Sequence, residues 1–311
     1  MPGAGIPRVN WRHPLAEGLV AAYFPGAFPY VPIANLAYPG SGDLTAAGST
    51  IVHELTQEGL WLALGGTAGT AWVSGIAPPQ MKPQGRFSAF IRGRYNGNAG
   101  TNTPVGIFGV SFTGNASTSP FWSWAIMPNT ATVSQRFGLG YASSSSTFLN
   151  TSINSSPALI TNAMSSCGIV ILGSPSISVD QQLYQNGVQY INNTTANIGA
   201  YGTTPNVIMG DTGGLARNCS FTLTAAYMWG AGIIRSTADM QYLDENPYAL
   251  FLWPQDYIMA EIVKAIAPPG TPTPSNKAIF WSPLTVGLGG AAYAERWLRR
   301  RKIKMRRLRG E

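Results

Sequence analysis

The sequence predicts an all-β fold built as an antiparallel two-sheet sandwich, or jelly roll, for three reasons. Charged residues make up only 11% of the 311 residues, whereas glycine (36) and proline (23) are abundant, a balance typical of many short strands joined by turns. Short apolar runs recur along the chain, and several alternate large apolar residues with small or polar ones. Stacked antiparallel sheets bury such alternating faces, so the pattern favours a sandwich.

The chain is predicted to begin with a proline-rich arm at residues 1–14, followed by a first strand within 15–24. Pro25 and Pro29 end this strand, because proline cannot donate a hydrogen bond to a strand ladder. The Gly/Ser/Ala-rich stretch 31–50 is predicted as a connection. Short strands are then expected at 60–64 and 72–73.

Residues 87–95 (FSAFIRGRY) show the clearest period-two pattern, since large apolar side chains alternate with small or charged ones. This pattern predicts a half-buried strand. The tract 142–156, rich in Ser, Thr and Asn, is predicted to be a loop. Further strands are expected at 105–112, 121–127, 136–141 and 168–172.

The pair Asn186-Gly187 predicts a tight hairpin between residues 182 and 191. Both residue types tolerate the positive φ angles that a two-residue hairpin turn requires. A polar loop is expected to follow at 192–206. Two more strands are then predicted at 207–211 and 219–230.

A short helix is predicted to start after Ser236. Asp239 stands three residues later, and this spacing is typical of a capping box. Pro247 stops the helix, and the apolar run 248–253 is predicted as the last strand of the body.

The Pro-rich stretch 254–276 predicts a stiff linker between a jelly-roll domain at 15–253 and a C-terminal segment at 277–311. The net charge of +7 belongs to that C-terminal segment. Residues 295–311 hold nine basic and two acidic residues, which leaves 11 of each over residues 1–294. Electrostatic arguments about partners therefore concern the C-terminal segment and not the body.

Four interpretations of the C-terminal segment are open: a membrane anchor, contact with nucleic acid phosphates, docking on an acidic protein surface, and a solvated tail. A membrane anchor is not expected, because the uncharged run 278–294 is shorter than about 20 apolar residues and contains Pro283 and three glycines. The candidate anchoring residues are Trp297, Arg299, Arg300, Arg301, Lys302, Lys304, Arg306, Arg307 and Arg309.

Several of these segments together resemble a known family. The succession of 183–188 (LYQNGV), 207–211 (VIMGD), the 221–229 strand and the helix after Ser236 resembles the C-terminal half of LamG-like, concanavalin A-like jelly-roll domains. The strand at 87–92 resembles the one that follows the first variable loop in such domains. The resemblance implies a sandwich that works in binding or assembly.

The two ends of the body resemble a particular version of this family. Residues 10–20 (NWRHPLAEGLV) and 246–251 (NPYALF) are similar to the start and close of such domains in tailed bacteriophage virion proteins. The resemblance covers residues 10–253 as a set of weak motifs, and none of these motifs is a catalytic signature.

Catalytic groups are sparse in the sequence. Glycoside hydrolysis needs a pair of carboxylates beside the scissile bond, and the nearest pair, Glu54 with Glu58, stands in a polar connection and is expected to face solvent. His13 and His53 are the only histidines, and both are expected to be structural. The sequence therefore predicts a protein that is not an enzyme.

No metal and no cofactor are expected. Some members of the resembled family bind calcium through carboxylates on the sandwich rim, yet a calcium site needs six or more oxygen ligands gathered together. In this chain the candidate aspartates are dispersed singly, at Asp43, Asp180, Asp211 and Asp239.

Sugar-binding members of the family present exposed aromatic side chains. The candidates for a glycan-facing aromatic in this chain are Trp122, Trp124, Tyr141 and Tyr201. An aromatic in a sandwich is nevertheless more often part of the core. Cys167 and Cys219 stand in apolar runs, and two buried thiols are favoured over a disulfide between them.

The leading functional hypothesis is a structural component of a bacteriophage virion, made in the host cytoplasm because residues 1–7 show no secretion signal. Its expected partners are capsid, portal, tail or fibre subunits, packaged nucleic acid through the C-terminal segment, and further copies of itself as a homo-oligomer. The alternative is a carbohydrate-binding module that recognises a host-surface glycan. A glycan-cleaving enzyme is a weaker third hypothesis.

Overall fold

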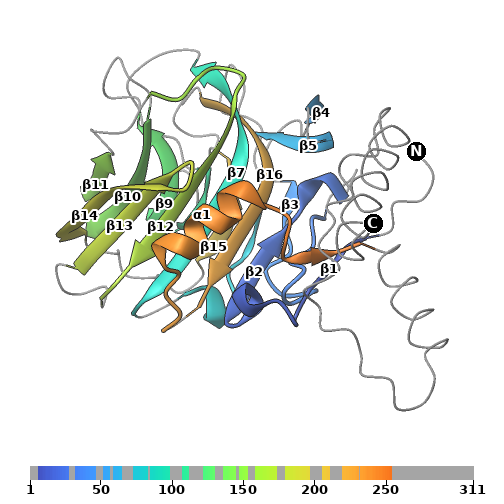
Figure 1. Cartoon of the computed structure of the whole chain (residues 1–311), viewed down its shortest axis with the longest axis horizontal. Helices are drawn as coiled ribbons and strands as arrows, with labels where there is room; N and C mark the ends of the chain where they lie inside the picture. Colours follow the sequence, from blue (N-terminus) through green and yellow to red (C-terminus); the bar gives the residue numbers. More distant parts are fainter. Residues whose placement is uncertain are drawn as a thin grey trace, which may run out of the picture. The chain divides into compact units, whose positions relative to one another are not determined.

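The computed structural model of the chain describes residues 6–27, 32–46, 52–56, 59–64, 73–82, 85–98, 107–111, 122–129, 136–144, 147–152, 158–173, 179–196, 205–210, 219–230 and 232–253. These residues form an antiparallel β-sandwich of an eight-stranded and a seven-stranded sheet (Figure 1). The prediction of an all-β jelly roll is thereby confirmed. The predicted C-terminal linker and anchoring segment lie outside the described residues.

In the eight-stranded sheet the order is β14 (Val188–Ala196), β13 (Val179–Gln185), β12 (Met164–Ile171), β7 (Phe87–Asn98), β16 (Cys219–Trp229), β5 (Gly59–Leu64) and β4 (Val52–Thr56), with β2 (Leu19–Tyr23) paired to β16 off this path. In the seven-stranded sheet it is β11 (Thr147–Ser152), β10 (Arg136–Ser144), β9 (Trp122–Asn129), β8 (Phe108–Ser111), β15 (Asn206–Met209), β6 (Val73–Ile76) and β3 (Thr45–Ala46). Short 3-10 turns occur at η1 (Pro14–Ala16), η2 (Pro25–Ala27) and η3 (Pro79–Met81).

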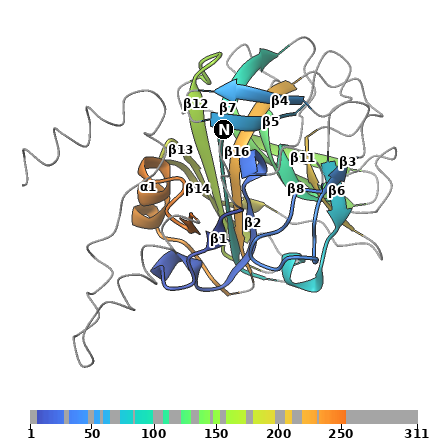
Figure 2. The same cartoon turned by 90° about the vertical axis from the view of Figure 1, so that its right-hand side faces the viewer.

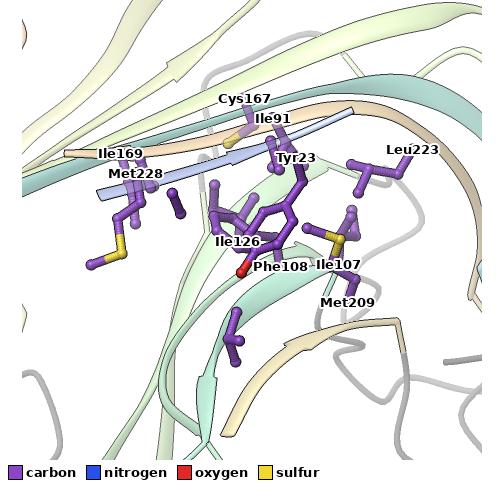
Figure 3. Close-up of a cluster of buried hydrophobic side chains, with 14 of the residues drawn as sticks. Tyr23, Ile91, Ile107, Phe108, Ile126, Cys167, Ile169, Met209, Leu223 and Met228 are labelled. Carbon is purple, nitrogen blue, oxygen red and sulfur yellow. The ribbon is translucent and has the colours of Figure 1, made fainter. Parts of the chain in front are cut away.

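The hydrophobic core lies between the two sheets, and alternation along β7 shows how the sequence builds it. Phe87, Ala89 and Ile91 belong to the core cluster, whereas Ser88 and Arg92 lie on the other face of the strand. Figure 3 shows part of the cluster, in which side chains from both sheets pack together; the labelled residues are Tyr23, Ile91, Ile107, Phe108, Ile126, Cys167, Ile169, Met209, Leu223 and Met228. The period-two pattern of 87–95 therefore predicted the face of β7 that turns to the core, whereas Ser88 and Phe90 on the other face are buried as well.

The hairpin predicted at Asn186-Gly187 joins β13 and β14. Both residues have positive φ, 51° at Asn186 and 73° at Gly187, as a two-residue turn requires. The Asn186 side chain also accepts a hydrogen bond of 3.0 Å from the Ser166 backbone N–H, which fixes the turn against β12. The predicted hairpin is confirmed.

The helix α1 (Thr237–Glu245) covers the outer face of the eight-stranded sheet (Figure 2). Its predicted capping box forms, since the Ser236 hydroxyl accepts from the Asp239 N–H and the Asp239 carboxylate accepts from the Ser236 N–H. Met240 and Leu243 are its buried side chains. A Cβ at Gly168 of β12 would lie 2.6 Å from the Met240 Sδ, so glycine allows the helix to approach the sheet closely.

Some polar stretches predicted as loops form strands instead. β10 and β11 occupy 136–152 apart from 145–146, and β14 continues to Ala196. Both β11 and β14 are edge strands of their sheets, where one side of the strand needs no partner and polar, Thr-rich sequence is tolerated. Glu54 likewise lies in β4 and not in a connection. The run 248–253 contributes only β17 (Phe251–Leu252), which follows a turn.

The two ends of the body meet in a small sheet. β1 (Arg8–Val9) pairs antiparallel with β17, with Val9 opposite Phe251, and the Asn10 N–H donates to the Leu250 carbonyl over 2.8 Å. In the part of the chain that the structure describes, no helix has the length and apolar character needed to cross a membrane.

Candidate binding surfaces

A loop at residues 35–43 is held rigidly against β2 by one buried asparagine. Asn35 is fully buried, and its Oδ1 accepts from the backbone N–H groups of Ala22 (3.1 Å) and Ala37 (3.2 Å). Its Nδ2 donates to the carbonyls of Val20 and Ser41, each over 3.1 Å. One amide group therefore satisfies four backbone groups and ties the loop to the strand.

Asp43 closes the same loop from its other end. Its carboxylate accepts from the Asn35 N–H at 2.9 Å and from the Gly40 N–H at 3.1 Å. Between these contacts, residues 38–41 form a β-turn in which the Ser41 N–H donates to the Tyr38 carbonyl and Gly40 has a φ of 85°. Proline followed by glycine at the central positions is the sequence of a type II turn.

The loop presents an exposed aromatic ring. Tyr38 is 43% exposed although its backbone is fixed on both sides by the contacts above. Among the side chains that the structure describes, Trp11 (56%) is the other exposed aromatic, and it lies in the turn after β1. A flat apolar ring on a rigid loop offers a stacking surface with little ordering cost on binding.

Sequence reasoning did not single out this loop as a site. Residues 31–50 contain no alternation or charge cluster, and Asn35 and Asp43 look like ordinary turn residues there. The Pro39-Gly40 pair is the one local signal that predicts the turn. The role of Asn35 depends on its contact with β2, and no spacing in the sequence predicts that contact.

Of the candidate glycan-facing aromatics, the structure describes the side chain of Trp124 only. Trp124 is fully buried, and its ring packs against Phe87 and Phe108 at centroid distances of 5.0 and 5.7 Å. It is therefore a core ring and not a glycan-facing one, because β9 directs it between the sheets. The side chains of Trp122 and Tyr141, all of Tyr201, and the basic residues 296–309 lie outside the described residues.

Several titratable groups that the sequence offers as candidates have structural roles in the described part of the chain. Within the described ranges, no group of three or more His, Cys, Asp or Glu side chains is placed to hold a metal ion. Asp239 belongs to the helix cap, and His13 stacks on Tyr242. Cys167 is a free, fully buried thiol whose pKa is raised by burial, so it packs as a small apolar side chain. The Cys219 side chain is outside the described part.

No protein-family model matches this sequence, and no curated protein matches it significantly. Solved structures do share its fold. The binding domain of Paraclostridial Mosquitocidal Protein 1 matches with a TM-score of 0.56 at 10% sequence identity, over 76% of this chain and 53% of that chain. The binding domain of botulinum neurotoxin serotype D matches with a TM-score of 0.51 at 9% identity, over 75% and 53%.

A smaller domain is matched over nearly its whole length. Domain 4 of AbnA, a GH43 extracellular arabinanase from Geobacillus stearothermophilus solved in complex with arabinotriose, has a TM-score of 0.50 at 11% identity, over 73% of this chain and 98% of that chain. This chain thus spans about half of the toxin binding domains. At such identities the likeness shows the fold alone, a jelly-roll sandwich of the kind used by binding domains.

Proposed function

We propose that this sandwich is a non-catalytic recognition module that binds a surface glycan through the loop at 35–43. The observation that carries the proposal is the exposed Tyr38 ring on a loop pinned by Asn35 and Asp43. The apolar face of a sugar ring packs on such an aromatic side chain, and the fixed backbone avoids the entropy cost of ordering a mobile loop. The arabinanase domain that shares the fold was solved with arabinotriose, which supports this ligand class.

A glycan array probed with the full chain tests this proposal, with arabino-oligosaccharides included. The ligands found are then titrated against Tyr38→Ala and Tyr38→Phe. We expect Tyr38→Ala to weaken binding about tenfold, which corresponds to loss of roughly 1.4 kcal/mol of stacking. Tyr38→Phe keeps the ring and serves as the matched control, so its affinity stays close to that of the wild type.

Two outcomes contradict the glycan proposal. Absence of any reproducible glycan binding is one. The other is equal glycan affinity of Tyr38→Ala and the wild type, which would mean that the glycan binds away from Tyr38. Trp11→Ala then tests the second exposed aromatic. Turnover of an oligosaccharide that a single carboxylate substitution abolishes would favour an enzyme instead.

The module acts, in this proposal, as a component of a bacteriophage virion. The supporting observation is that the Asn10–Leu250 hydrogen bond joins the two phage-like segments, 10–20 and 246–251, next to the pairing of β1 with β17. A domain whose two ends lie side by side can be attached to a particle at that one place, and the rest of its surface then stays exposed. The Tyr38 loop lies on a different segment and stays available to a ligand.

Purified particles test the virion proposal, because the protein must copurify with them at a fixed copy number. Truncation after Pro274 removes the whole C-terminal segment, including the candidate anchoring residues between Trp297 and Arg309. We expect the truncated protein to lose particle association while it keeps glycan binding. Absence from particles contradicts the virion role, and unchanged association of the truncated protein contradicts anchoring by the C-terminal segment.

A further inference from the structure

The segment 13–17 before β2 is packed against α1 and the outer face of the eight-stranded sheet. His13 is 7% exposed, and its ring stacks on Tyr242 of α1 with 5.6 Å between centroids. Its Nε2 lies 3.3 Å from the Tyr242 hydroxyl. On the sheet side, the Trp229 indole N–H donates to the Leu15 carbonyl over 2.6 Å.

The hydrogen bonds fix which nitrogen of His13 carries the proton. The Leu15 backbone N–H donates to His13 Nδ1 over 3.1 Å, and this bond caps the start of η1. A nitrogen that accepts cannot carry a proton, so the neutral ring is protonated at Nε2 and donates to the Tyr242 oxygen. The cap therefore exists only while His13 is neutral.

A buried cation lies beside this ring. Arg235 is 7% exposed, its guanidinium donates to the Glu17 carbonyl, and it stacks over the Trp229 ring at 5.1 Å. The carboxylates that act on Arg235 are Glu17 of the segment itself and Asp239 of α1. The charged and titratable groups that act on His13 include Arg235 and Tyr242, and the charges of Asp239 and Glu17 act in turn on Arg235.

Protonation of His13 would oppose this arrangement in two ways. A proton on Nδ1 would face the Leu15 N–H, so a cap would become a contact between two donors. A second positive charge would also stand beside Arg235 in a mostly buried site. Burial, and then the charge of Arg235, lower the pKa of His13 below its ordinary value, in agreement with this geometry.

We propose that segment 13–17 is an acid-sensitive latch, in which protonation of His13 removes the cap on Leu15 and releases the segment from α1 and β16. The pairing of β1 with β17 opens with it, because β1 is joined to the segment by only the turn at 10–12. The sandwich stays folded, since Trp229 and Tyr242, which hold the segment, lie outside the core between the sheets. Mild acid then frees residues 6–17 from the body.

Amide hydrogen exchange of the full chain as a function of pH tests the latch. After correction for the intrinsic pH dependence of exchange, we expect protection of Leu15, Ala16 and the β1 amides to fall as the pH drops below about 6.5, by up to about tenfold per pH unit for one proton taken up on opening. Core amides of β7 and β12 keep their protection. Equal loss throughout the domain would show global unfolding and overturn the proposal.

Matched variants identify the titrating group. His13→Asn keeps a side-chain acceptor for the Leu15 N–H but cannot titrate, so protection of the segment becomes independent of pH in this range. His53→Asn replaces the other histidine, in β4, and leaves the wild-type pH profile unchanged. A pH profile that persists in His13→Asn, or disappears in His53→Asn, would overturn the latch.

A titration of the wild-type protein gives a second measurement that does not depend on a variant folding. The His13 ring signals and the Trp229 indole N–H signal should move with the same midpoint, below the ordinary histidine pKa of about 6.5, because the indole is bonded to the Leu15 carbonyl. A Trp229 signal that does not respond while His13 titrates would contradict release of the segment.

Discussion

Two irregular segments flank β2, and they are held in place by different chemistry. The loop at 35–43 follows the strand and is fixed by the Asn35 amide, which bonds backbone groups of β2 and of the loop. The segment 13–17 precedes the strand and is fixed by the imidazole of His13 and the guanidinium of Arg235. Both attachments use side chains that are largely buried, Asn35 in the loop and His13 with Arg235 at the segment.

The difference between them lies in how they respond to solvent. An amide has no titratable proton, so the Asn35 attachment is the same at every physiological pH. An imidazole loses its acceptor when it is protonated, and the His13 attachment changes with it. The first chemistry suits a surface that must keep one shape for a ligand, and the second suits a segment that changes its attachment.

The largest expected effect comes from Asn35→Ala, which breaks the rigid attachment. The backbone N–H groups of Ala22 and Ala37 would lose their acceptor in a buried environment, at about 1–3 kcal/mol each. We expect the free energy of unfolding to fall by about 3–5 kcal/mol, as measured by urea denaturation. Ser41→Ala keeps the carbonyl that Asn35 uses and serves as the control, with little change.

A loss below about 1 kcal/mol in Asn35→Ala would mean that the loop is not held by this side chain. The variant also connects stability to binding. If the fixed backbone of Tyr38 matters for a ligand, Asn35→Ala weakens glycan binding in buffer without denaturant, where the domain is still folded. Ser41→Ala does not weaken binding under the same condition.

An intermediate effect is expected for Arg235→Met, which alters the other attachment. The variant loses the bond to the Glu17 carbonyl and the stacking on Trp229, for a destabilisation of about 1–2 kcal/mol. It also removes the cation beside His13, so the pKa of His13 rises toward its ordinary value. Arg235→Lys keeps the charge and loses the planar stacking, so it separates the two effects.

Nuclear magnetic resonance titration of the His13 ring measures this shift. Arg235→Met should titrate at a higher pH than the wild type, and Arg235→Lys close to it. The same midpoint in Arg235→Met and the wild type would mean that burial alone lowers the pKa of His13.

Much of the sandwich follows from local patterns in the sequence. The alternation at 87–95 indicates the buried face of β7, Asn186-Gly187 indicates the hairpin, and Ser236 with Asp239 indicates the start of α1. Each of these signals involves fewer than ten neighbouring residues, so it can be interpreted without knowledge of the tertiary fold.

The candidate sites depend on contacts that no local pattern encodes. His13 and Tyr242 are 229 positions apart in the chain, and Asn35 acts on β2 only because the loop folds back on that strand. Trp124 is a candidate for a sugar surface by its residue type alone, and only the packing of β9 in the sandwich shows that it points into the core. The strand β11 could not be predicted for the same reason. It is polar because it lies at the edge of a sheet, where Ser, Thr and Asn are tolerated, and the sequence alone does not show that position.

The smallest expected effect is a difference in how stability depends on pH. His13 has a lowered pKa in the folded protein, so the unfolded chain takes up the proton first. The contribution of His13 is fully present above the unfolded value of about 6.5 and is lost as the pH falls from there toward the folded pKa. Between about pH 7.5 and pH 5.5 we expect the free energy of unfolding of the wild type to fall by about 1 kcal/mol or less from this source.

The free energy of unfolding of Asn35→Ala should fall by the same amount as that of the wild type, because the Asn35 side chain does not titrate. That of His13→Asn should fall measurably less. Urea denaturation of the three proteins at both pH values decides the matter: parallel losses in wild type and His13→Asn would mean that the two attachments of β2 do not differ in their response to acid.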